Sequence, residues 1–504
     1  MTERRFYITT AIDYANGPPH LGHALEKIGA DVIARYRRMR GDKVHFVIGM
    51  DEHGQKVAQT AASRGISPQQ WTDRIAGEFR ATWGALGISY DDFIRTTEPR
   101  HRVAVEEMIR RMIVKGDLYR SIYAGHYCVG CEAYKTEDEL VDGRCSTHPT
   151  REIQWMEEED WFFRLSRYGP ELLRLLDERP EFVQPESRRN EVRRMVEDIK
   201  DISVSRSLLG WGIPWPGDAD PTVYVWIDAL TNYLSAIGFP DSEYRAHWPA
   251  ALHVIGKDII RFHCLYWPAM LLSADLPLPE RVWAHGFMTM GGGKISKSSG
   301  VAFDLNEVFE RHGADALRYF LLREIPWDGD GNFSLERFDE RYTAELANDL
   351  GNLASRTIAM VQKYRGGRVP GAGSTSLDEQ THLCVGEYRE RMDAFLLHEA
   401  LAIVLGLVAE ANGFVDAAAP WKLAREPERA ADLDAALRSL IRALAVTAVL
   451  LFPFMPEKMS ELWSRLGAGE AAMPLLDDVV ALEPAGRQVQ AGGVLFPRPE
   501  LSGV

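Results

Sequence analysis

The hydrophobic pattern near the amino terminus predicts a strand, a tight turn and a helix. Residues 6–10 are mostly apolar, and PPHLGH at residues 18–23 follows as a turn rich in proline and glycine. His20 and His23 fall in the first turn of the helix, where free backbone N–H groups and the helix dipole favour an anion such as phosphate. Taken alone, the two histidines are better interpreted as polar caps of a surface helix. The helix itself is indicated by apolar side chains at three- and four-residue steps, with Gly41 as its end, at Leu21, Leu25, Ile28, Val32 and Tyr36.

A second strand is expected at residues 44–48, and it ends in the polar sequence GMDEHG at residues 49–54. Continuous apolar runs of this kind are typical of buried parallel strands, and α/β sheets bind ligands at the carboxyl ends of such strands. Helical patterns follow to about residue 116, so this first part predicts a β-α-β-α half of a nucleotide-binding fold. The motif GxGxxG does not follow the first strand, which argues against a nicotinamide or flavin dinucleotide.

Three cysteines and one histidine have the spacing of a metal site. They form CxxC, thirteen intervening residues and CxxH, at Cys128, Cys131, Cys145 and His148. Three thiolates and one imidazole close a tetrahedral Zn²⁺ site with no open position, which indicates structural rather than catalytic zinc. The acidic run at residues 157–160 is expected to be a solvated loop, and the aromatic run at residues 161–163 is expected to be packed core.

Strand patterns resume at residues 221–226 and 252–255, so the sheet is expected to continue after the zinc-bearing insertion. Ile259, His263 and Trp267 then follow at four-residue steps, on one helical face. A single histidine on such a face is as often a packed core residue as one that binds a ligand.

A second candidate centre is the sequence GGGKISKSSG at residues 291–300. Its glycines allow close approach to a ligand, and its lysines and hydroxyl groups could close over a polyphosphate and neutralise it. A basic, serine-rich surface loop is the alternative, and for this motif alone it is the better interpretation.

From about residue 338 the pattern is helical almost throughout and predicts an antiparallel helix bundle. A connection rich in glycine, serine and proline at residues 366–374 separates two of the helices. The proline-rich tail from about residue 470 is expected to run along the surface as a strap.

Composition restricts the class of protein. With 504 residues, of which 46% are hydrophobic and 26% charged, a soluble globular protein of roughly three domains is expected. We expect no membrane span, because no uninterrupted apolar run reaches about 18 residues, and we expect a cytoplasmic protein without a targeting peptide. The net charge of −15 argues against a nonspecific DNA coat, but not against a nucleic acid bound through a local basic patch.

The order of these motifs resembles the class I aminoacyl-tRNA synthetases, and specifically the methionyl-tRNA synthetase family, along essentially the whole chain. HLGH and KISKS are weak alone, but they occur with YVWIDA at residues 224–229, IGKD at 255–258 and NLASR at 352–356. The resemblance implies an α/β fold with a Rossmann-like parallel-sheet catalytic domain, a zinc-knuckle insertion and an all-α anticodon-binding helix bundle. The expected segments are 1–116 and 226–275 for the catalytic halves, 117–225 for the insertion, 276–337 for the link that carries KISKS, 338–470 for the bundle and 471–504 for the strap.

The resemblance also implies roles for individual residues. Those that would bind ATP and its leaving pyrophosphate are His20, His23, Gly256, Asp258, Lys294, Lys297 and Ser298. Asp51 would lie near the α-amino group of methionine, and the rest of the methionine pocket would be Ala11, Ile12, Tyr14, Trp226, Tyr233, Ile259, His263 and Trp267. The residues that would read the anticodon carry amide, guanidinium and indole groups suited to single-stranded bases, and they are Asn352, Arg356 and Trp421.

The implied reaction joins methionine to tRNA in two steps. With ATP and Mg²⁺, methionine becomes methionyl-adenylate with release of pyrophosphate, and the adenylate then acylates the terminal adenosine of initiator and elongator tRNA(Met). Positioning and electrostatics carry such a reaction without a side-chain nucleophile. Because no additional carboxyl-terminal domain follows the bundle, we expect a monomer.

Three other interpretations stay open from the sequence. A class I synthetase for another apolar amino acid is one, although the insertion is too short to hold a large editing domain beside a zinc knuckle. A small-molecule nucleotidyltransferase also uses an HxGH turn, but it needs neither the long bundle nor the knuckle. A catalytically inactive, zinc-containing RNA-binding protein would not need intact HLGH and KISKS sequences.

Overall fold

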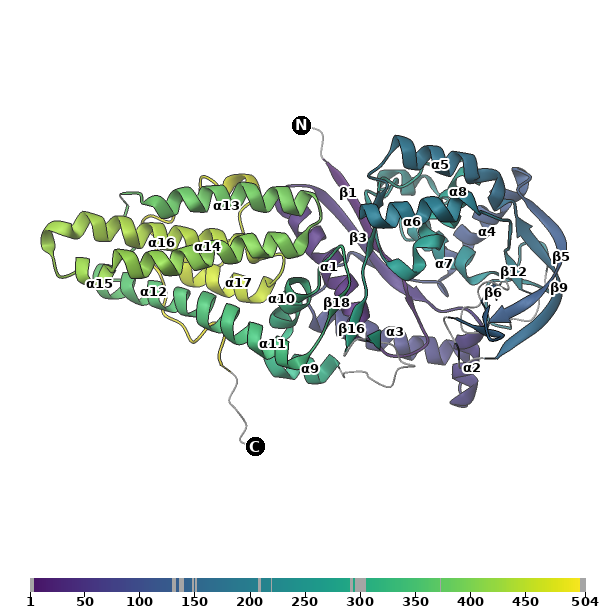
Figure 1. The fold of residues 1–504 in the computed structure, drawn as a ribbon, viewed down its shortest axis with the longest axis horizontal. Helices are drawn as coiled ribbons and strands as arrows, with labels where there is room; N and C mark the ends of the chain where they lie inside the picture. Colours follow the sequence, from purple (N-terminus) through teal and green to yellow (C-terminus); the bar gives the residue numbers. More distant parts are fainter. Residues whose placement is uncertain are drawn as a thin grey trace.

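The computed structural model describes residues 4–128, 133–135, 140–146, 149, 152–206, 210–218, 220–290, 293–294, 305–371 and 373–498. The molecule is elongated, with a helix bundle at one end, a parallel sheet in the middle and a long antiparallel ribbon at the other end (Figure 1). Both the parallel sheet followed by helices and the bundle agree with the fold class expected from the sequence.

The central sheet is parallel throughout. In the described part of the chain it has seven strands in the order β10-β15-β14-β1-β3-β2, with β4 also paired to β3. The strand β1 lies between β14 and β3, so Ile8 is opposite Leu252 on one side and Phe46 on the other. The strands are β1 Arg5–Thr10, β2 Asp13–Tyr14, β3 Lys43–Asp51, β4 Asp92–Arg95, β10 Val183–Gln184, β14 Leu252–Gly256 and β15 Val282–His285.

Alternate side chains of these strands enter two different hydrophobic cores. Ile8 and Phe46 belong to the core on one face, whereas Tyr7 and Val47 belong to the core on the other, as the two-residue period of a strand requires. The first face is covered by α1 Leu21–Met39, α2 Gln55–Ser63 and α3 Pro68–Ala85. The second is covered by α4 Pro99–Val114, α5 Gly169–Glu178, α6 Glu186–Glu197, α7 Val225–Ser235 and α8 Trp267–Ser273.

The insertion is built on a long antiparallel ribbon. Two expectations were wrong, one in this insertion and one in the central sheet. The acidic run lies inside strand β9 and not in a loop, and the buried carboxylate of Asp160 accepts hydrogen bonds from Ser203 and Ser205. Strand β4 was also missed, because helix had been expected throughout residues 55–116. The elements are β5 Leu118–Cys128, β6 Ala133–Lys135, β7 Leu140–Val141, β8 Arg144–Cys145, β9 Ile153–Phe163, β11 Ile202–Ser203, β12 Ser205–Arg206 and β13 Thr222–Val223.

The strand expected at residues 221–226 is only partly formed, because Val225 and Trp226 already belong to a helix. Only β13 is extended, and it pairs with β12 instead of joining the parallel sheet, while α7 begins at Val225. The sequence pattern was misleading because α7 is buried on almost every side from Ile227 to Ser235. A helix buried all round shows no amphipathic period, and its aromatic and β-branched residues then favour a strand assignment.

Between the sheet and the bundle lie short strands and helices that carry the KISKS sequence. Lys294 ends β17, while Lys297 and Ser298 lie outside the described residues. The elements are β16 Met288–Met290, β17 Gly293–Lys294, β18 Gly331–Asn332, α9 Leu305–His312, α10 Ala314–Glu324 and α11 Leu335–Arg341.

The carboxyl-terminal part is a bundle whose helices pack side by side along its length (Figure 1). By length and hydropathy alone, one segment of the described residues, Leu397–Leu423, could cross a membrane. Its apolar side chains instead pack into the core against α13 and α16, as in the core helix of a soluble bundle. The helices are α12 Asn352–Arg365, α13 Ser376–Asp393, α14 Leu397–Ala418, α15 Pro420–Leu423, α16 Ala430–Leu451 and α17 Pro456–Trp463.

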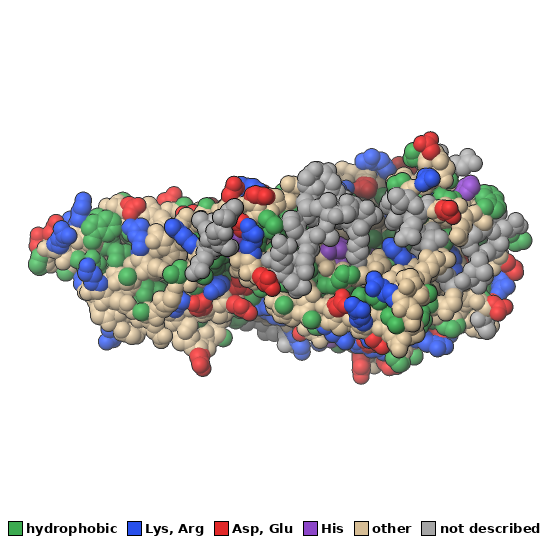
Figure 2. Space-filling model, turned by 90° about the horizontal axis from the view of Figure 1, so that it is seen from below, with side chains coloured by type: hydrophobic (Ala, Val, Ile, Leu, Met, Phe, Trp, Pro, Cys, Tyr) green, Lys and Arg blue, Asp and Glu red, His purple; other side chains and the backbone are tan. Residues whose placement is uncertain are grey.

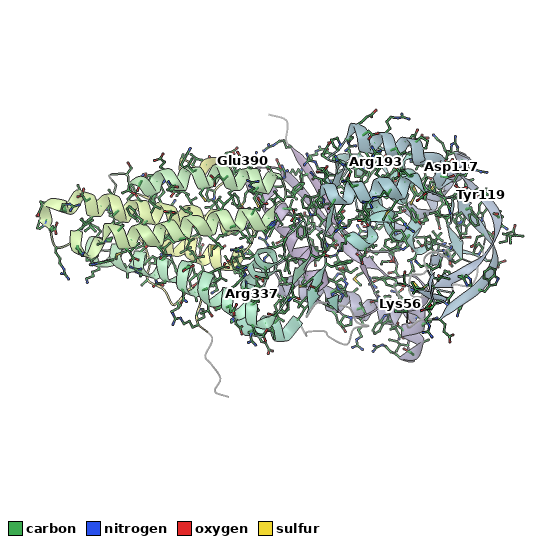
Figure 3. All side chains as sticks on the ribbon, in the orientation of Figure 1. Lys56, Asp117, Tyr119, Arg193, Arg337 and Glu390 are labelled. Atoms are coloured by element: carbon green, nitrogen blue, oxygen red, sulfur yellow. The ribbon has the colours of Figure 1, made fainter. Side chains whose placement is uncertain are left out.

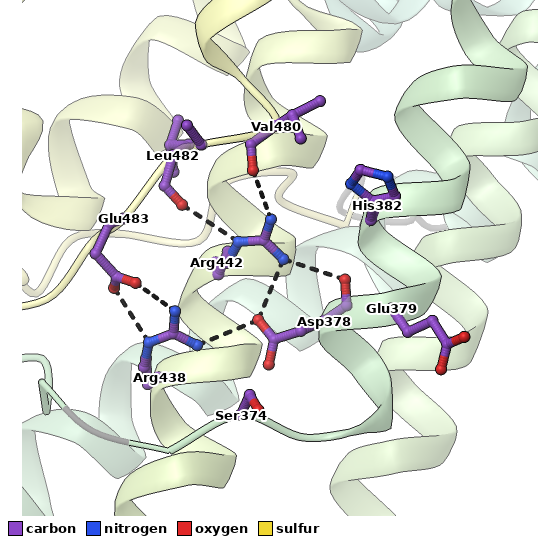
Figure 4. A pocket seen from close by; sticks show the side chains of 10 residues that line it. Ser374, Asp378, Glu379, His382, Arg438, Arg442, Val480, Leu482 and Glu483 are labelled. Atoms are coloured by element: carbon purple, nitrogen blue, oxygen red, sulfur yellow. Dashed lines mark hydrogen bonds and ion pairs between the residues drawn. The ribbon is translucent and has the colours of Figure 1, made fainter.

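The chain after the bundle is fastened back onto it by two arginines of α16. Arg442 donates to the backbone carbonyls of Val480 and Leu482 at 2.9 and 3.2 Å, and Arg438 pairs with Glu483 (Figure 4). Asp378 of α13 lies between the two guanidinium groups. These contacts hold the tail, which includes a short 3₁₀ turn at Leu476–Asp478, against α13 and α16.

Candidate active site

The HLGH turn is a capping box made from two histidines. His20 is the N-cap residue of α1, and its Nδ1 accepts from the backbone N–H of Gly22 at 3.1 Å. The Nδ1 of His23 accepts from the backbone N–H of His20 at 3.3 Å, and the two rings stack with centroids 3.7 Å apart. Because a backbone N–H only donates, the proton of each neutral ring is on Nε2. Both rings therefore carry an N–H donor suited to phosphate oxygens.

Other predicted residues lie at the carboxyl edge of the sheet, next to this turn. Ala11 follows β1 and donates its backbone N–H to Val254 of β14 at 3.0 Å. Asp51 ends β3 opposite Tyr14 and is 9% exposed. Gly256 ends β14, and a Cβ at this position would lie 2.8 Å from Asp258 Oδ1, so a larger residue would require the Asp258 carboxylate to shift. The parallel strands thus bring residues from three separate segments to one edge.

Three of the predicted methionine-pocket residues form a closed hydrogen-bonded cluster. The hydroxyl of Tyr233 lies 2.7 Å from His263 Nε2, and His263 Nδ1 lies 3.0 Å from the carbonyl oxygen of Ile259. The carbonyl can only accept, so Nδ1 carries the ring proton and Nε2 accepts from the tyrosine. Burial lowers the pKa of His263 to about 4, so the imidazole is neutral at neutral pH. The ring of Trp267 meets Tyr233 edge-on at 5.9 Å.

The other pocket residues divide between the two cores. Ala11, Ile12 and Trp226 are partly buried against the hydrophobic core that contains Tyr233 and Trp267. Tyr14 instead packs against the core on the opposite face of the sheet. The expected regular helical spacing also differs, because a 3₁₀ turn, Lys257–Ile259, and a π-helix, Phe262–Tyr266, precede α8. A π-helix is a frequent feature of functional sites.

Sequence reasoning missed His253 and Phe262. His253 lies fully buried in β14, its Nδ1 is 2.6 Å from Thr9 Oγ1, and its Nε2 accepts from Trp267 Nε1 at 3.3 Å. Burial lowers the pKa of His253 well below its usual value, so this ring is also neutral. Phe262 stacks on Trp226 with centroids 3.6 Å apart. The available signal was the presence of a histidine inside an otherwise apolar strand.

A buried lysine, also missed, joins the pocket wall to the HLGH helix. Lys27 lies one helical turn after His23 and is fully buried. Its ammonium group donates to the carbonyl of Ala11, to Asp13 and to Glu26 at 2.8, 2.9 and 2.7 Å. Burial would lower the pKa of Lys27, but the two carboxylates outweigh burial and raise it. The group is therefore a permanent cation with its three donors used.

The expected zinc ligands are only half within the described residues. Cys128 ends β5 and Cys145 ends β8, and both thiols are fully buried and not in a disulfide. Cys131 and His148 lie outside the described residues. Among the residues that the structure does describe, no cluster of three histidines, cysteines or carboxylates could hold a metal. Buried reduced thiols at two of the four positions fit a structural zinc site.

The predicted anticodon residues lie on the bundle, remote from the sheet edge. Asn352 begins α12, and Arg356, one turn later, donates to Asp416 of α14 at 3.0 Å. Trp421 on α15 is 36% exposed. Helices α12 and α15 both lie in the bundle, at the end of the molecule opposite the antiparallel ribbon (Figure 1). An exposed indole is a surface on which a base can stack, and amide and guanidinium groups are donors for base edges.

Comparisons with known proteins agree with this geometry. A family model described as "tRNA synthetases class I (M)" matches residues 6–153 and 138–358, and one described as "Anticodon binding domain of methionyl tRNA ligase" matches residues 365–500. A methionine–tRNA ligase of Brucella melitensis biotype 1 is 43% identical over 510 residues, covering 99% of this chain and 98% of the relative. That of Bacillus subtilis (strain 168) is 41% identical over 520 residues, covering 98% and 78%. A solved structure of Mycobacterium tuberculosis methionyl-tRNA synthetase in complex with methionyl-adenylate superposes with a TM-score of 0.94 at 40% identity, covering 98% of this chain and all of that one.

The neutral His263 predicts a pH dependence of stability. Its pKa is about 4 in the folded chain against about 6.5 unfolded, so its contribution is complete above pH 6.5 and is lost as the pH falls toward 4. We expect the melting temperature of the wild type to fall more steeply over this interval than that of His263→Gln. His382→Gln, at an exposed histidine, is the control and should follow the wild type. Parallel curves for the wild type and His263→Gln would contradict the assignment.

Replacing the buried lysine should destabilise the fold strongly. Lys27→Met keeps the length of the side chain but leaves the carboxylates of Asp13 and Glu26 buried without their cation. We expect a loss of about 3–5 kcal/mol in the free energy of unfolding, measured with denaturant. Lys115→Met removes an exposed ion pair with Asp275 and should cost less than about 1 kcal/mol. Equal effects of the two substitutions would show that the buried cluster does not stabilise the chain.

Proposed function

This chain belongs to the class I methionine–tRNA ligases, and from that premise we propose how its own residues carry the reaction. The enzyme activates methionine with ATP to methionyl-adenylate, releasing pyrophosphate, and transfers the methionyl group to the 3′-terminal adenosine of tRNA(Met). The observation that carries the residue assignment is the histidine-capped turn at the carboxyl edge of the parallel sheet, and the hydrogen-bonded pair of Tyr233 and neutral His263 supports the proposed side-chain pocket.

In the first step, the HLGH turn holds the ATP phosphates. The Nε2–H groups of His20 and His23 donate to phosphate oxygens and stabilise the charge that develops as the methionine carboxylate attacks the α-phosphate. Gly256 and Asp258 hold the ribose, since glycine leaves the backbone open to close approach. Mg²⁺ bound with ATP supplies additional positive charge at the phosphates. Lys294, Lys297 and Ser298 clamp the departing pyrophosphate.

The side chain of methionine is selected by the part of the pocket whose proposed residues are uncharged, whereas Asp51 serves the ammonium group. Asp51 pairs with the α-ammonium group of the substrate, and the thioether packs among aromatic rings, against whose edges sulfur is favourable. His263 is neutral, and its hydrogen bonds go to Tyr233 and Ile259. The proposed pocket wall is therefore apolar apart from this one hydrogen-bonded group. Charged side chains would be buried there without a counter-ion, at a cost of several kcal/mol.

The bundle reads the anticodon of initiator and elongator tRNA(Met). Trp421 offers a ring on which a splayed base stacks, and Asn352 and Arg356 donate to base edges. Acidic and basic side chains are interspersed over the described surface in Figure 2, which suits local recognition better than a uniform basic coat. Arginine at position 356 exchanges its bond with Asp416 for bonds to RNA.

Several further features belong to this proposal. A structural Zn²⁺ held by Cys128, Cys131, Cys145 and His148 orders the insertion, since buried thiols occupy the two described positions. We also propose the division into catalytic halves, insertion, KISKS link, bundle and strap, with the difference that β10 of the expected insertion and β15 of the expected link belong to the parallel sheet. We also propose that the enzyme is a monomer and works in the cytoplasm.

Exchange of radiolabelled pyrophosphate into ATP tests the activation step. We expect exchange with methionine and at least a hundredfold lower kcat/KM with isoleucine, leucine or valine, because the pocket is shaped for an unbranched thioether. Exchange that depends on isoleucine and not on methionine would overturn the substrate assignment.

Substitution of the exposed tryptophan tests the anticodon assignment. Trp421→Ala should lower kcat/KM for aminoacylation of tRNA(Met) about 10- to 100-fold, since stacking of one base contributes about 1–3 kcal/mol. Pyrophosphate exchange, which needs no tRNA, should stay at the wild-type rate. Leu383→Ala, at another exposed apolar side chain of the bundle, is the matched control and should leave both rates unchanged. An equal loss in the exchange rate of Trp421→Ala would indicate a folding defect instead of lost base stacking.

A further inference from the structure

Asp228 of the YVWIDA sequence has no role in the reaction described above. Asp228 lies in the first turn of α7 and is fully buried. Each of its carboxylate oxygens meets a histidine: Oδ2 is 2.6 Å from His53 Nδ1, and Oδ1 is 2.6 Å from His101 Nε2. The two histidines come from different elements, because His53 follows β3 and His101 lies on α4.

The charge state of this group is clear from its surroundings. Burial would raise the pKa of Asp228, but the two imidazoles outweigh burial and lower it to about 2. The carboxylate is therefore ionised and only accepts, so His53 donates through Nδ1 and His101 through Nε2. These are charge-assisted bonds in a dry environment, which are shorter, stronger and more directional than apolar contacts.

The other partners of these residues are equally well defined. His101 Nδ1 lies 2.8 Å from the hydroxyl of Ser235 at the far end of α7, so α4 is tied to both ends of that helix. The ring of His53 meets Trp211 edge-on, and Trp211 Nε1 donates to the carbonyl of Glu52 at 2.6 Å. The carboxylate of Glu52 in turn accepts from Arg95 at 2.7 Å. The residues that follow β3 are thus held by contacts with Asp228, Trp211 and Arg95.

The location of Asp228 joins the two sides of the amino-acid site. His53 is two residues from Asp51, the proposed partner of the α-ammonium group, and Asp228 is two residues from Trp226 in the proposed side-chain pocket. Tyr233 lies on the same helix, α7. We propose that Asp228 is a positioning residue for methionine: its bonds to His53 and His101 set the span between the ammonium-binding tip of β3 and the aromatic wall on α7. This inference rests on the proposed function.

The expected signature is a change in methionine affinity that ATP does not share. A span that is wrong by a fraction of an ångström weakens a ligand held at both ends, whereas ATP is held by α1 and β14, which Asp228 does not contact in any described bond. Uniform weakening of both substrates, or loss of fold stability alone, would be the signature of a merely structural carboxylate. The KM values for methionine and ATP therefore separate the two roles.

Asp228→Asn is the test, because asparagine keeps the shape of the side chain but replaces one acceptor by a donor. In pyrophosphate exchange we expect the KM for methionine to rise at least tenfold, with the KM for ATP within twofold of the wild type. Asp117→Asn is the matched control. Asp117 is fully buried too, it bonds to Ser273 at 2.8 Å and to Tyr168, and it lies at the outer side of the catalytic half (Figure 3). This control should lower the melting temperature and leave both KM values within twofold.

A milder variant covers the case in which Asp228→Asn does not fold. His101→Asn removes the two bonds from α4, to Asp228 and to Ser235, but keeps the bond of His53, and it should raise the KM for methionine severalfold, again without changing that for ATP. An unchanged methionine KM in either folded variant, or equal increases for both substrates, would overturn the positioning role. A wild-type enzyme that exchanges with a different amino acid would instead overturn the proposed substrate, and the same comparison of KM values would then be made with that amino acid.

Discussion

The two halves of the molecule depend on one ion pair that is entirely shut off from solvent. Arg318 of α10 and Asp31 of α1 are both fully buried, 2.7 Å apart. The other donors of Arg318 go to the carbonyls of Leu86, Pro453 and Phe454, so the guanidinium joins the HLGH helix, the end of α3 and the turn between α16 and α17. A buried charge is tolerable only when all of its donors are satisfied, so this arrangement requires the sheet and the bundle to meet in one relative orientation.

The hydrophobic core follows the same route. The core on the α1 face of the sheet continues without a break through α10 into the bundle and as far as Phe496 of the strap. The opposite core, which contains the aromatic pocket, ends at the sheet. The side of the sheet that carries the HLGH helix therefore shares one hydrophobic core with the helices that carry Asn352 and Trp421, whereas Tyr233 and Trp267 belong to the other core. A packed path through α1 thus joins the proposed anticodon residues to the HLGH turn.

Local sequence patterns predicted correctly those elements whose determining residues are contiguous in the sequence. The HLGH helix was predicted correctly because its turn, its amphipathic face and its glycine end are contiguous in sequence, and the buried strands β3 and β14 were equally legible. The first two residues of α7, Val225 and Trp226, were assigned to a strand because burial on almost all sides removes the period of this helix. The buried partners of Asp228 and Lys27 were beyond reach for a different reason: His53 lies 175 residues from Asp228, and no spacing rule links them. The KISKS lysine Lys297 and the zinc ligands Cys131 and His148 lie outside the described residues, and their roles stay predictions.

The capping of α1 by its own histidines changes what kind of anion receptor this turn is. In a glycine-rich phosphate loop the backbone amides touch the phosphate directly. Here two backbone N–H groups already donate to Nδ1 atoms of the histidines. Each imidazole therefore accepts a hydrogen bond at Nδ1 and carries an N–H donor at Nε2, on the opposite side of the ring. The turn thus presents ring N–H donors in place of these backbone N–H donors, and the ring donors lie farther from the helix by the width of an imidazole. The reach of the turn toward a nucleotide is thus set by the imidazole side chains and not by the backbone amides alone.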